Sequence, residues 1–160
     1  MSAEAVTAER SVTPARTWYA ISSFVLSLIG LGAAGYLTYE HYTGSTTLAC
    51  KDTGTVNCLK VTTSTYSTQL GIPVAVLGLL FYVVMAALCS PPAWSLARRW
   101  GAVTWVRLAW SLVGVLMVFF LVWAELFRID AICLWCTAVH VVTVALFGVL
   151  VFAAALADEE

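Results

Sequence analysis

The chain has few charged residues and no surplus of either sign. Only 11% of its 160 residues are Asp, Glu, Lys or Arg, and the formal net charge is −1. This balance gives no indication of binding to a nucleic acid or to an anionic partner. The content of hydrophobic residues is 61% and the mean hydropathy is +0.91, which together exclude an ordinary soluble domain. Internal repeats and domain boundaries are also lacking.

Four apolar runs predict an all-α membrane protein, a bundle of four transmembrane helices. The runs are close to the length that crosses about 30 Å of hydrocarbon. The expected membrane domain is residues 18–157, with spans at about 18–38, 73–89, 103–127 and 132–157, preceded by a disordered cytoplasmic tail at residues 1–17. A signal peptide is the alternative for the first run. That run is longer than the apolar region of a signal peptide, and no clean cleavage site follows it.

The segments between the runs differ in polarity. Residues 40–70 are rich in Thr and Ser and are expected to form the one sizeable loop outside the membrane, folded over the mouth of the bundle. Residues 90–101 are expected to be a short link, and residues 128–130 a tight turn. Four small residues in the first run have two interpretations: they allow close helix packing, or they are ordinary membrane-helix composition. They are Gly30, Ala33, Ala34 and Gly35.

The orientation follows from the basic residues and the cysteines. With the N-terminus in the cytoplasm, more basic residues lie inside than outside, as the positive-inside rule requires. The inner set is Arg10, Arg16, Arg98, Arg99 and Arg107, and the outer set is Lys51, Lys60 and Arg128. Both close cysteine pairs then lie on the extracytoplasmic side, where disulfides persist. We therefore expect a cell-membrane protein with both termini in the cytoplasm.

Four of the five cysteines form two close pairs, Cys50 with Cys58 and Cys133 with Cys136. The second pair is a CxxC motif at the start of the last apolar run. A helix N-terminus favours thiolate over thiol, and a stabilised thiolate is a good leaving group in disulfide exchange. The remaining cysteine, Cys89, falls at the cytoplasmic end of the second span and is expected to be a packing residue.

Two pairs on one face of a membrane bundle indicate redox relay chemistry. Thiol–disulfide exchange passes two electrons from pair to pair through mixed disulfides. A pair in a loop can meet a soluble protein, whereas a pair at a helix end can meet a molecule dissolved in the bilayer. Two alternatives remain open. One is a zinc site of four thiolates, for which seven residues between Cys50 and Cys58 is an unusual spacing. The other is a scaffold with two structural disulfides.

The chain resembles the vitamin K epoxide reductase family, in its bacterial branch. The resemblance extends from about Ile21 to Leu150 and is carried by the order of several motifs. These are Tyr36–Tyr42 at the end of the first span, Cys50-x7-Cys58, Ser64-x-Tyr66, Gly71–Gly78 and Cys133-Leu134-Trp135-Cys136. In the other quinone-linked thiol oxidase family the CxxC lies in the first loop, whereas here the widely spaced pair comes first.

The resemblance implies a role for each paired cysteine. A thioredoxin-like (DsbA-like) partner exchanges first with Cys50, and Cys58 then attacks the CxxC at Cys133. This frees Cys136, whose thiolate donates electrons to a membrane quinone, menaquinone or ubiquinone. The residues alone agree with this order, because the loop is the exposed part and Cys136 lies one turn deeper than Cys133. Since no thioredoxin-like domain follows Ala157, the partner is expected to be a separate chain.

Two positions depart from the animal enzymes of the family, which carry Asn at the position of Val74 and Tyr at the position of His140. Those groups hydrogen-bond the quinone oxygens, which Val74 cannot do. His140 can, because it lies four residues after Cys136 on the same helix face, although a hydrogen bond to a neighbouring helix is the alternative. We expect His140, Val74, Leu77 and Phe81 to contact the quinone, and we expect no metal ligands.

Other polar residues near the pairs have less specific roles. Glu125 is expected at the membrane interface rather than buried, and Asp130 is expected to be part of the turn. Glu40 and His41 flank the outer end of the first span, where they either anchor it at the interface or carry a proton to the reduced quinone.

The predicted function is quinone-dependent oxidation of protein thiols, which drives disulfide formation outside the cytoplasm. One alternative is reduction of a quinone or its epoxide for its own sake, as in a vitamin K cycle. Because the Asn of the animal enzymes is absent, a plain quinone is the expected substrate rather than vitamin K epoxide. The other alternative is the structural membrane protein with two disulfides.

Overall fold

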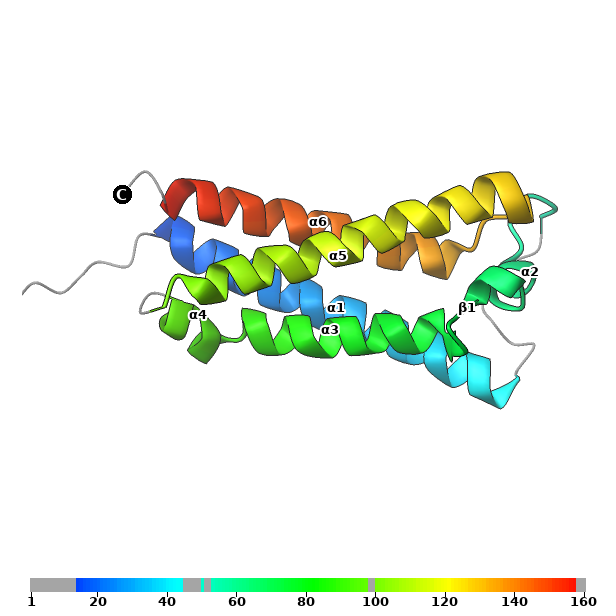
Figure 1. Ribbon diagram of the computed structural model, residues 1–160, viewed down its shortest axis with the longest axis horizontal. Coiled ribbons are helices and arrows are strands. Elements are labelled where there is room, and N and C mark those ends of the chain that lie inside the picture. Colours follow the sequence, from blue (N-terminus) through cyan, green and yellow to red (C-terminus); the bar gives the residue numbers. More distant parts are fainter. Residues whose placement is uncertain (1–13, 45–49, 51–52, 98–99, 158–160) are drawn as a thin grey trace, which may run out of the picture.

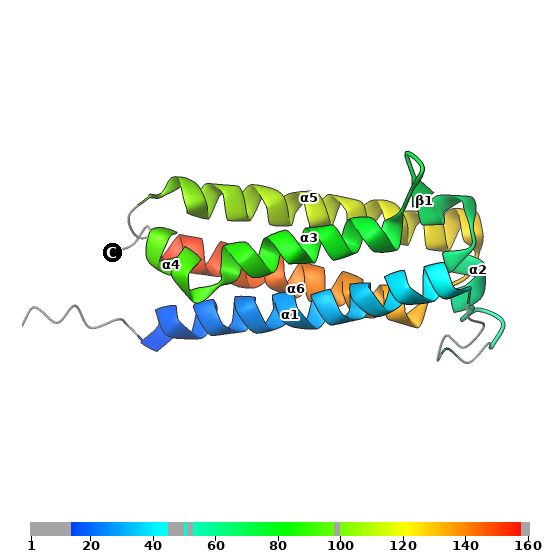
Figure 2. The same ribbon diagram turned by 90° about the horizontal axis from the view of Figure 1, so that it is seen from below.

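Four long helices make up most of the protein. The computed structural model describes residues 14–44, 50, 53–97 and 100–157. The long helices are α1 (Pro14–Thr43), α3 (Val74–Cys89), α5 (Ala102–Ala124) and α6 (Leu134–Ala157). They lie side by side along the long axis of the molecule and alternate in direction (Figures 1 and 2). Helix α1 packs against α3 and α6, and α5 packs against α6. The expected helical bundle is therefore confirmed.

Three helical segments are each long and apolar enough to cross a membrane: Thr17–Thr43, Ala102–Ile129 and Leu134–Leu156. Helix α3 is shorter, because its 16 residues rise only about 24 Å at 1.5 Å per residue. Helix α4 (Pro91–Ala97) follows α3 after a bend of 63°, and the two together pass as a fourth span. The described residues thus contain three candidate spans, or four if the bent pair is one.

Two boundaries differ from the expectation. Helix α1 begins at Pro14, so residues 14–17 of the predicted tail are helical, while residues 1–13 lie outside the described residues. Proline suits the first turn of a helix, where its missing N–H costs nothing. The expected link after the second span contains α4, because Ser90 has an extended backbone that ends α3 and Pro91 and Pro92 then start a new helix.

The loop between α1 and α3 is folded into short elements at one end of the bundle (Figure 1). They are α2 (Cys58–Thr62), the 3₁₀-helix η1 (Thr65–Ser67) and the hairpin strands β1 (Thr68–Gln69) and β2 (Ile72–Pro73). The hairpin turn places Leu70 at φ 53° and Gly71 at φ 82°, as a two-residue turn of type I′ requires. The hairpin leads directly into the first turn of α3.

The end of α5 also differs from the expected turn. Residues Glu125–Ile129 form η2, a π-helical extension of α5, and Asp130 follows in the left-handed conformation at φ 52°. A π-helical turn has one more residue than an α-helical turn. The reversal between α5 and α6 is consequently longer than predicted, and it changes which residues face inward.

The core of the bundle is centred on Tyr82 of α3, which is completely buried. Its hydroxyl lies 2.7 Å from Thr143 Oγ1 and donates to the carbonyl of Val139 at 3.1 Å, which joins α3 to α6. On the other side its ring fills the space beside Gly30, where an added Cβ would overlap the ring. Gly30 therefore permits the close approach of α1 and α3.

Arg107 is buried at the corner between α3 and α4, although the sequence suggested only a cytoplasmic position. Its Nε and Nη2 atoms donate to the carbonyl of Leu88 at 3.1 and 2.7 Å. The guanidinium also lies 4.0 Å from the centre of the Trp94 ring. A cation at the C-terminal end of α3 is favourable for the helix dipole, so these contacts stabilise the bend.

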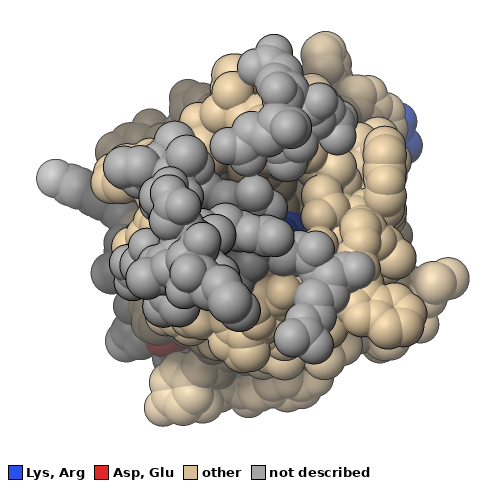
Figure 3. All heavy atoms as spheres, turned by 90° about the vertical axis from the view of Figure 1, so that its left-hand side faces the viewer, with Lys and Arg blue, Asp and Glu red and all other residues tan. Residues whose placement is uncertain are grey.

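The two described ends of the chain lie at the same end of the bundle, opposite α2 (Figure 1). Figure 3 shows this end, and its described side chains are almost all neither acidic nor basic. Along the bundle, large apolar side chains point outward, including Trp105 at 73% and Phe119 at 67% exposure. This outward apolar surface suits a lipid environment.

The first prediction concerns orientation. Replace the four paired cysteines by serine, leave the buried Cys89, and add Lys60→Cys in α2 or Trp100→Cys at the opposite end. If both termini are cytoplasmic, a membrane-impermeant thiol reagent should label the Lys60→Cys protein in intact cells and the Trp100→Cys protein only after lysis. The reverse pattern would show that the orientation is wrong.

The second prediction concerns the close approach at Gly30. Gly30→Ala should lower the free energy of unfolding by about 1–3 kcal/mol, because the added methyl group has to displace the Tyr82 ring. Gly32→Ala is the matched control, since no atom lies within 4 Å of an added Cβ there. It should be neutral or slightly stabilising. Thermal unfolding in detergent measures both, and equal melting temperatures would contradict the packing argument.

Candidate active site

The loop cysteines form a disulfide. Cys50 and Cys58 are bonded, with their Cα atoms 6.1 Å apart. Cys58 is the first residue of α2, and Asn57 caps this helix, its side-chain oxygen accepting the backbone N–H of Lys60 at 2.8 Å. Cys58 is 2% exposed, whereas Cys50 is half-buried. Cys50 is therefore the more accessible half of the disulfide.

A short backbone bridge connects the loop to the segment before α6. Val56 pairs with Ile132 in a parallel β-bridge. The N–H of Asn57 donates to the carbonyl of Ile132 at 3.1 Å, and the N–H of Ile132 donates to the carbonyl of Thr55 at 2.9 Å. Asn57 and Ile132 immediately precede Cys58 and Cys133, so the bridge brings these two cysteines to the same place.

All four paired cysteines meet in one apolar cluster. Its buried members are Cys58, Val61, Ala131 and Cys133, and the half-buried residues packed against them are Cys50, Ile129, Trp135 and Cys136. The Trp135 ring in turn packs on Tyr36 of α1, with 4.8 Å between ring centres. The loop pair and the CxxC pair are thus neighbours, although they are far apart in the sequence.

The two CxxC cysteines have different surroundings. Cys133 precedes α6, and its carbonyl accepts the backbone N–H of Thr137 at 2.8 Å. Its sulfur accepts the N–H of Cys136 at 3.3 Å, in the manner of a helix cap. A hydrogen bond from the Cys136 thiol lowers the pKa of the Cys133 thiol, and the N–H groups of Cys136 and Trp135 act in the same direction. Cys133 is therefore suited to thiolate formation.

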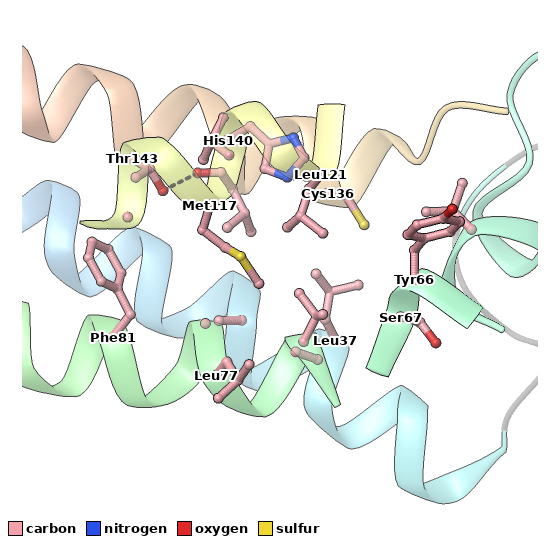
Figure 4. Close-up of a pocket in the computed structure, with 18 of the residues that line it drawn as sticks. Leu37, Tyr66, Ser67, Leu77, Phe81, Met117, Leu121, Cys136, His140 and Thr143 are labelled. Atoms are coloured by element: carbon pink, nitrogen blue, oxygen red, sulfur yellow. Dashed lines mark hydrogen bonds between the residues drawn. The ribbon is translucent and has the colours of Figure 1, made fainter. Parts of the chain in front are cut away.

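A cavity of about 360 Å³ lies between the helices, next to the CxxC motif. Cys136 lines it, and so do the four residues predicted to contact a quinone: Val74, Leu77, Phe81 and His140. Figure 4 shows Cys136 and His140 beside each other on α6, with Leu37 and Leu77 across the cavity. The structure therefore places the predicted residues around one space, while their contact with a quinone stays a prediction.

Tyr66 and Ser67 of η1 lie at the loop end of the cavity, and Phe81 and Thr143 lie at its other end (Figure 4). The hydroxyl of Tyr66 accepts a hydrogen bond from Arg128 Nε at 2.8 Å. Its ring also packs against Trp123 of α5, with 6.5 Å between ring centres. Tyr66 therefore fastens the loop to the end of α5 above the cavity.

The comparison with protein families agrees with this arrangement. A family model described as "Vitamin K epoxide reductase family" matches residues 21–151. The chain belongs to the vitamin K epoxide reductase family. None of the curated proteins compared with the chain matches it. The resemblance found in the sequence is thus confirmed at the level of the family.

Members of the vitamin K epoxide reductase family are oxidoreductases, and their redox activity on cysteines is linked to quinones. Family membership and the apolar helices together make this chain a membrane protein. Within the described part of the chain, no group of three or more His, Cys, Asp or Glu side chains is arranged to hold a metal ion. Of the four thiolates that the zinc alternative requires, Cys50 and Cys58 are bonded to each other in the structure.

The sequence interpretation was wrong about Glu125. This residue was expected at the membrane interface, but it is 5% exposed and lines the cavity together with Cys136. Its position in an apolar run was a usable signal, because an ionisable side chain within a span is costly and usually functional. The π-helical turn that directs it inward leaves no clear pattern in the sequence. The sequence also did not predict that Tyr66, part of the Ser64-x-Tyr66 motif, fastens the loop to the end of α5.

Cys89 is remote from this site. It is completely buried at the end of α3, near Arg107 and the hydroxyl groups of Ser23 and Ser27. Cys89→Ser should retain most of the thiol–quinone turnover, with a packing loss of about 1 kcal/mol. Activity and melting temperature of the purified variant test this. Loss of turnover in a folded, normally abundant protein would show that Cys89 belongs to the redox pathway.

Proposed function

We propose that the chain catalyses quinone-dependent oxidation of protein thiols and so drives disulfide formation outside the cytoplasm. Electrons enter from a separate thioredoxin-like protein, pass through the Cys50–Cys58 pair and then the Cys133–Cys136 pair, and leave on a membrane quinone. The observation that carries this proposal is the meeting of both pairs in one cluster, with Cys136 also lining the cavity.

Entry of electrons is expected at Cys50. It is half-buried, whereas Cys58 is almost fully buried, so an incoming thiolate has better access to the sulfur of Cys50. Attack there breaks the Cys50–Cys58 bond, forms a mixed disulfide with the partner, and releases the Cys58 thiolate. A second partner thiol then attacks the mixed disulfide, which leaves the partner oxidised and the loop pair reduced.

The internal exchange is expected between Cys58 and Cys133. The Cys58 thiolate attacks the Cys133–Cys136 disulfide at Cys133 and releases Cys136 as a thiolate, after which Cys50 attacks Cys58 and restores the loop disulfide. The CxxC pair then holds the two electrons. This distribution, with Cys50 and Cys58 bonded and Cys133 and Cys136 as thiols, is the one present in the structure.

The cavity suits a quinone ring in size and chemistry. Ligand pockets are typically about 300–1,000 Å³ and mostly apolar. Val74, Leu77 and Phe81 would form apolar walls, and the imidazole of His140 would hydrogen-bond a ring oxygen. A bound quinone supplies an acceptor for two electrons and two protons. Because Cys136 lines this space and Cys133 does not, Cys136 is the thiol that would face it.

The alternative of epoxide reduction has less support. Val74 lines the cavity with a side chain that can neither donate nor accept a hydrogen bond. A plain quinone therefore fits these residues better. The direct test is quinol formation by purified protein supplied with a reduced thioredoxin-like protein and either menaquinone or ubiquinone, with an epoxide as the comparison substrate. No turnover with either quinone would overturn the proposal.

The order of transfer predicts a trapped species. In Cys136→Ala, the Cys133 thiolate should attack the loop disulfide at Cys58, release Cys50 as a thiol, and accumulate as a Cys58–Cys133 disulfide. With Cys136 absent, no second CxxC thiol can displace Cys58 from this bond, and only the Cys50 thiol can reverse it. Mass mapping of disulfides in the purified variant measures it, and the double variant with Cys58→Ser is the control. Recovery of a Cys50–Cys133 disulfide instead would reverse the roles of the two loop cysteines.

A further inference from the structure

Glu125 is a buried carboxyl group that the electron pathway does not use. It is the first residue of η2 and is 5% exposed, whereas Leu126 and Phe127 after it are 51% and 73% exposed. A carboxyl group in the membrane interior is expensive to bury and is usually retained for function. Its surroundings therefore indicate what it does.

The carboxyl group of Glu125 reaches both the CxxC motif and the cavity. It interacts with the backbone N–H of Cys133, and it lines the cavity with Cys136 and His140. It is also close enough for its charge to act on the thiols of both Cys133 and Cys136. Of the acidic residues in the described part of the chain, Glu125 is the one that lines this cavity.

The π-helical turn holds Glu125 in this position. Its carbonyl accepts the backbone N–H of Asp130 and, at 3.3 Å, that of Ala131. These bonds turn the chain back so that Cys133 returns to the Glu125 side chain. Single π-helical turns of this kind often occur at functional sites.

Other ionisable groups lie around Glu125, and only some of them line the cavity. Those that line the cavity are His41 of α1, Tyr66 of η1, Tyr82 of α3, and Cys136 and His140 of α6. Lys60 of α2, Arg128 of η2 and Cys133, just before α6, lie nearby. Lys60 and Arg128 are directed elsewhere, since Lys60 donates to the carbonyl of Asp130 and Arg128 donates to Tyr66. His140 lines the cavity but has no contact with Cys133 comparable to that of Glu125.

We propose that Glu125 carries protons from the Cys133 and Cys136 thiols to the oxygens of a quinone in the cavity. This inference rests on the proposed function. Cys133 is buried and Cys136 faces an apolar cavity, so their protons need an acceptor inside the protein. A carboxylate that touches both the CxxC motif and the cavity can take a proton from one and release it to the other. The site then never holds more than the single negative charge that it began with.

The reaction balances with Glu125 unchanged at the end. Two S–H bonds break and one S–S bond forms between Cys133 and Cys136, which oxidises the pair by two electrons. The quinone takes up these electrons and two protons and becomes a quinol. Glu125 accepts each thiol proton as a carboxylate and donates it to a quinone oxygen, which regenerates the carboxylate.

Glu125→Gln separates proton transfer from a structural role. Glutamine keeps an oxygen that can accept the N–H of Cys133, but it cannot take up a proton. Quinol formation by the pre-reduced protein in a single turnover should slow by about 100-fold, within the usual range for general acid–base catalysis. The dependence of this rate on pH should lose an inflection that Glu125→Asp retains. Asp130→Asn is the matched control, because it removes a charge from an exposed position in the same segment.

A second measurement does not need the quinone. Ultraviolet absorbance of the thiolates is followed against pH in the reduced protein. Thiolate should form at lower pH in Glu125→Gln than in wild type, because a neighbouring negative charge has been removed. Asp130→Asn should change this titration little. A Glu125→Gln protein that melts at the wild-type temperature and matches wild type in both measurements would overturn the role of Glu125. Wild-type protein that forms no quinol would instead overturn the proposed function itself.

Discussion

The two backbone hydrogen bonds to Ile132 are the contact on which the rest of the site depends. They hold the segment before Cys58 against the segment before Cys133. Hydropathy alone does not predict that these two segments meet. Ordering a loop costs roughly 1–2 kcal/mol per residue, and the disulfide and the buried side chain of Cys58 help to offset this cost. With the loop held there, the sulfurs of the two pairs stay close to each other, which raises the effective concentration of the reacting groups.

The arrangement also separates thiol exchange at the loop disulfide from the reaction at the cavity. The four cysteines share one dry cluster, but only Cys136 among them lines the cavity. In the proposed function, a protein partner that reacts at Cys50 therefore meets a cysteine that does not line the cavity. In the proposed function, electrons cross from the loop side to the quinone side only by successive thiol exchanges.

Hydropathy and cysteine spacing predict much of this protein, because both act locally. Long apolar runs are helical in any membrane protein, and a CxxC before such a run lies at a helix start. Burial of Glu125 was not predictable in this way, since it depends on one extra residue in the η2 turn and on the return of Cys133. The buried position of Arg107 was missed for a similar reason. Its partners, Leu88 and Trp94, meet only after α3 bends into α4.

The short length of α3 connects the far end of the bundle with the site. At about 24 Å, α3 is shorter than the hydrocarbon core, and the contacts of Arg107 with Leu88 hold its C-terminal end at the α4 corner. At the N-terminal end of α3, the chain is formed by the hairpin and η1 rather than by a longer helix. This brings Val74 to the level of the cavity and places Tyr66 above it, fastened to Arg128. A longer α3 would occupy the space where the loop now meets the cavity, so the bend at one end helps to create the site at the other.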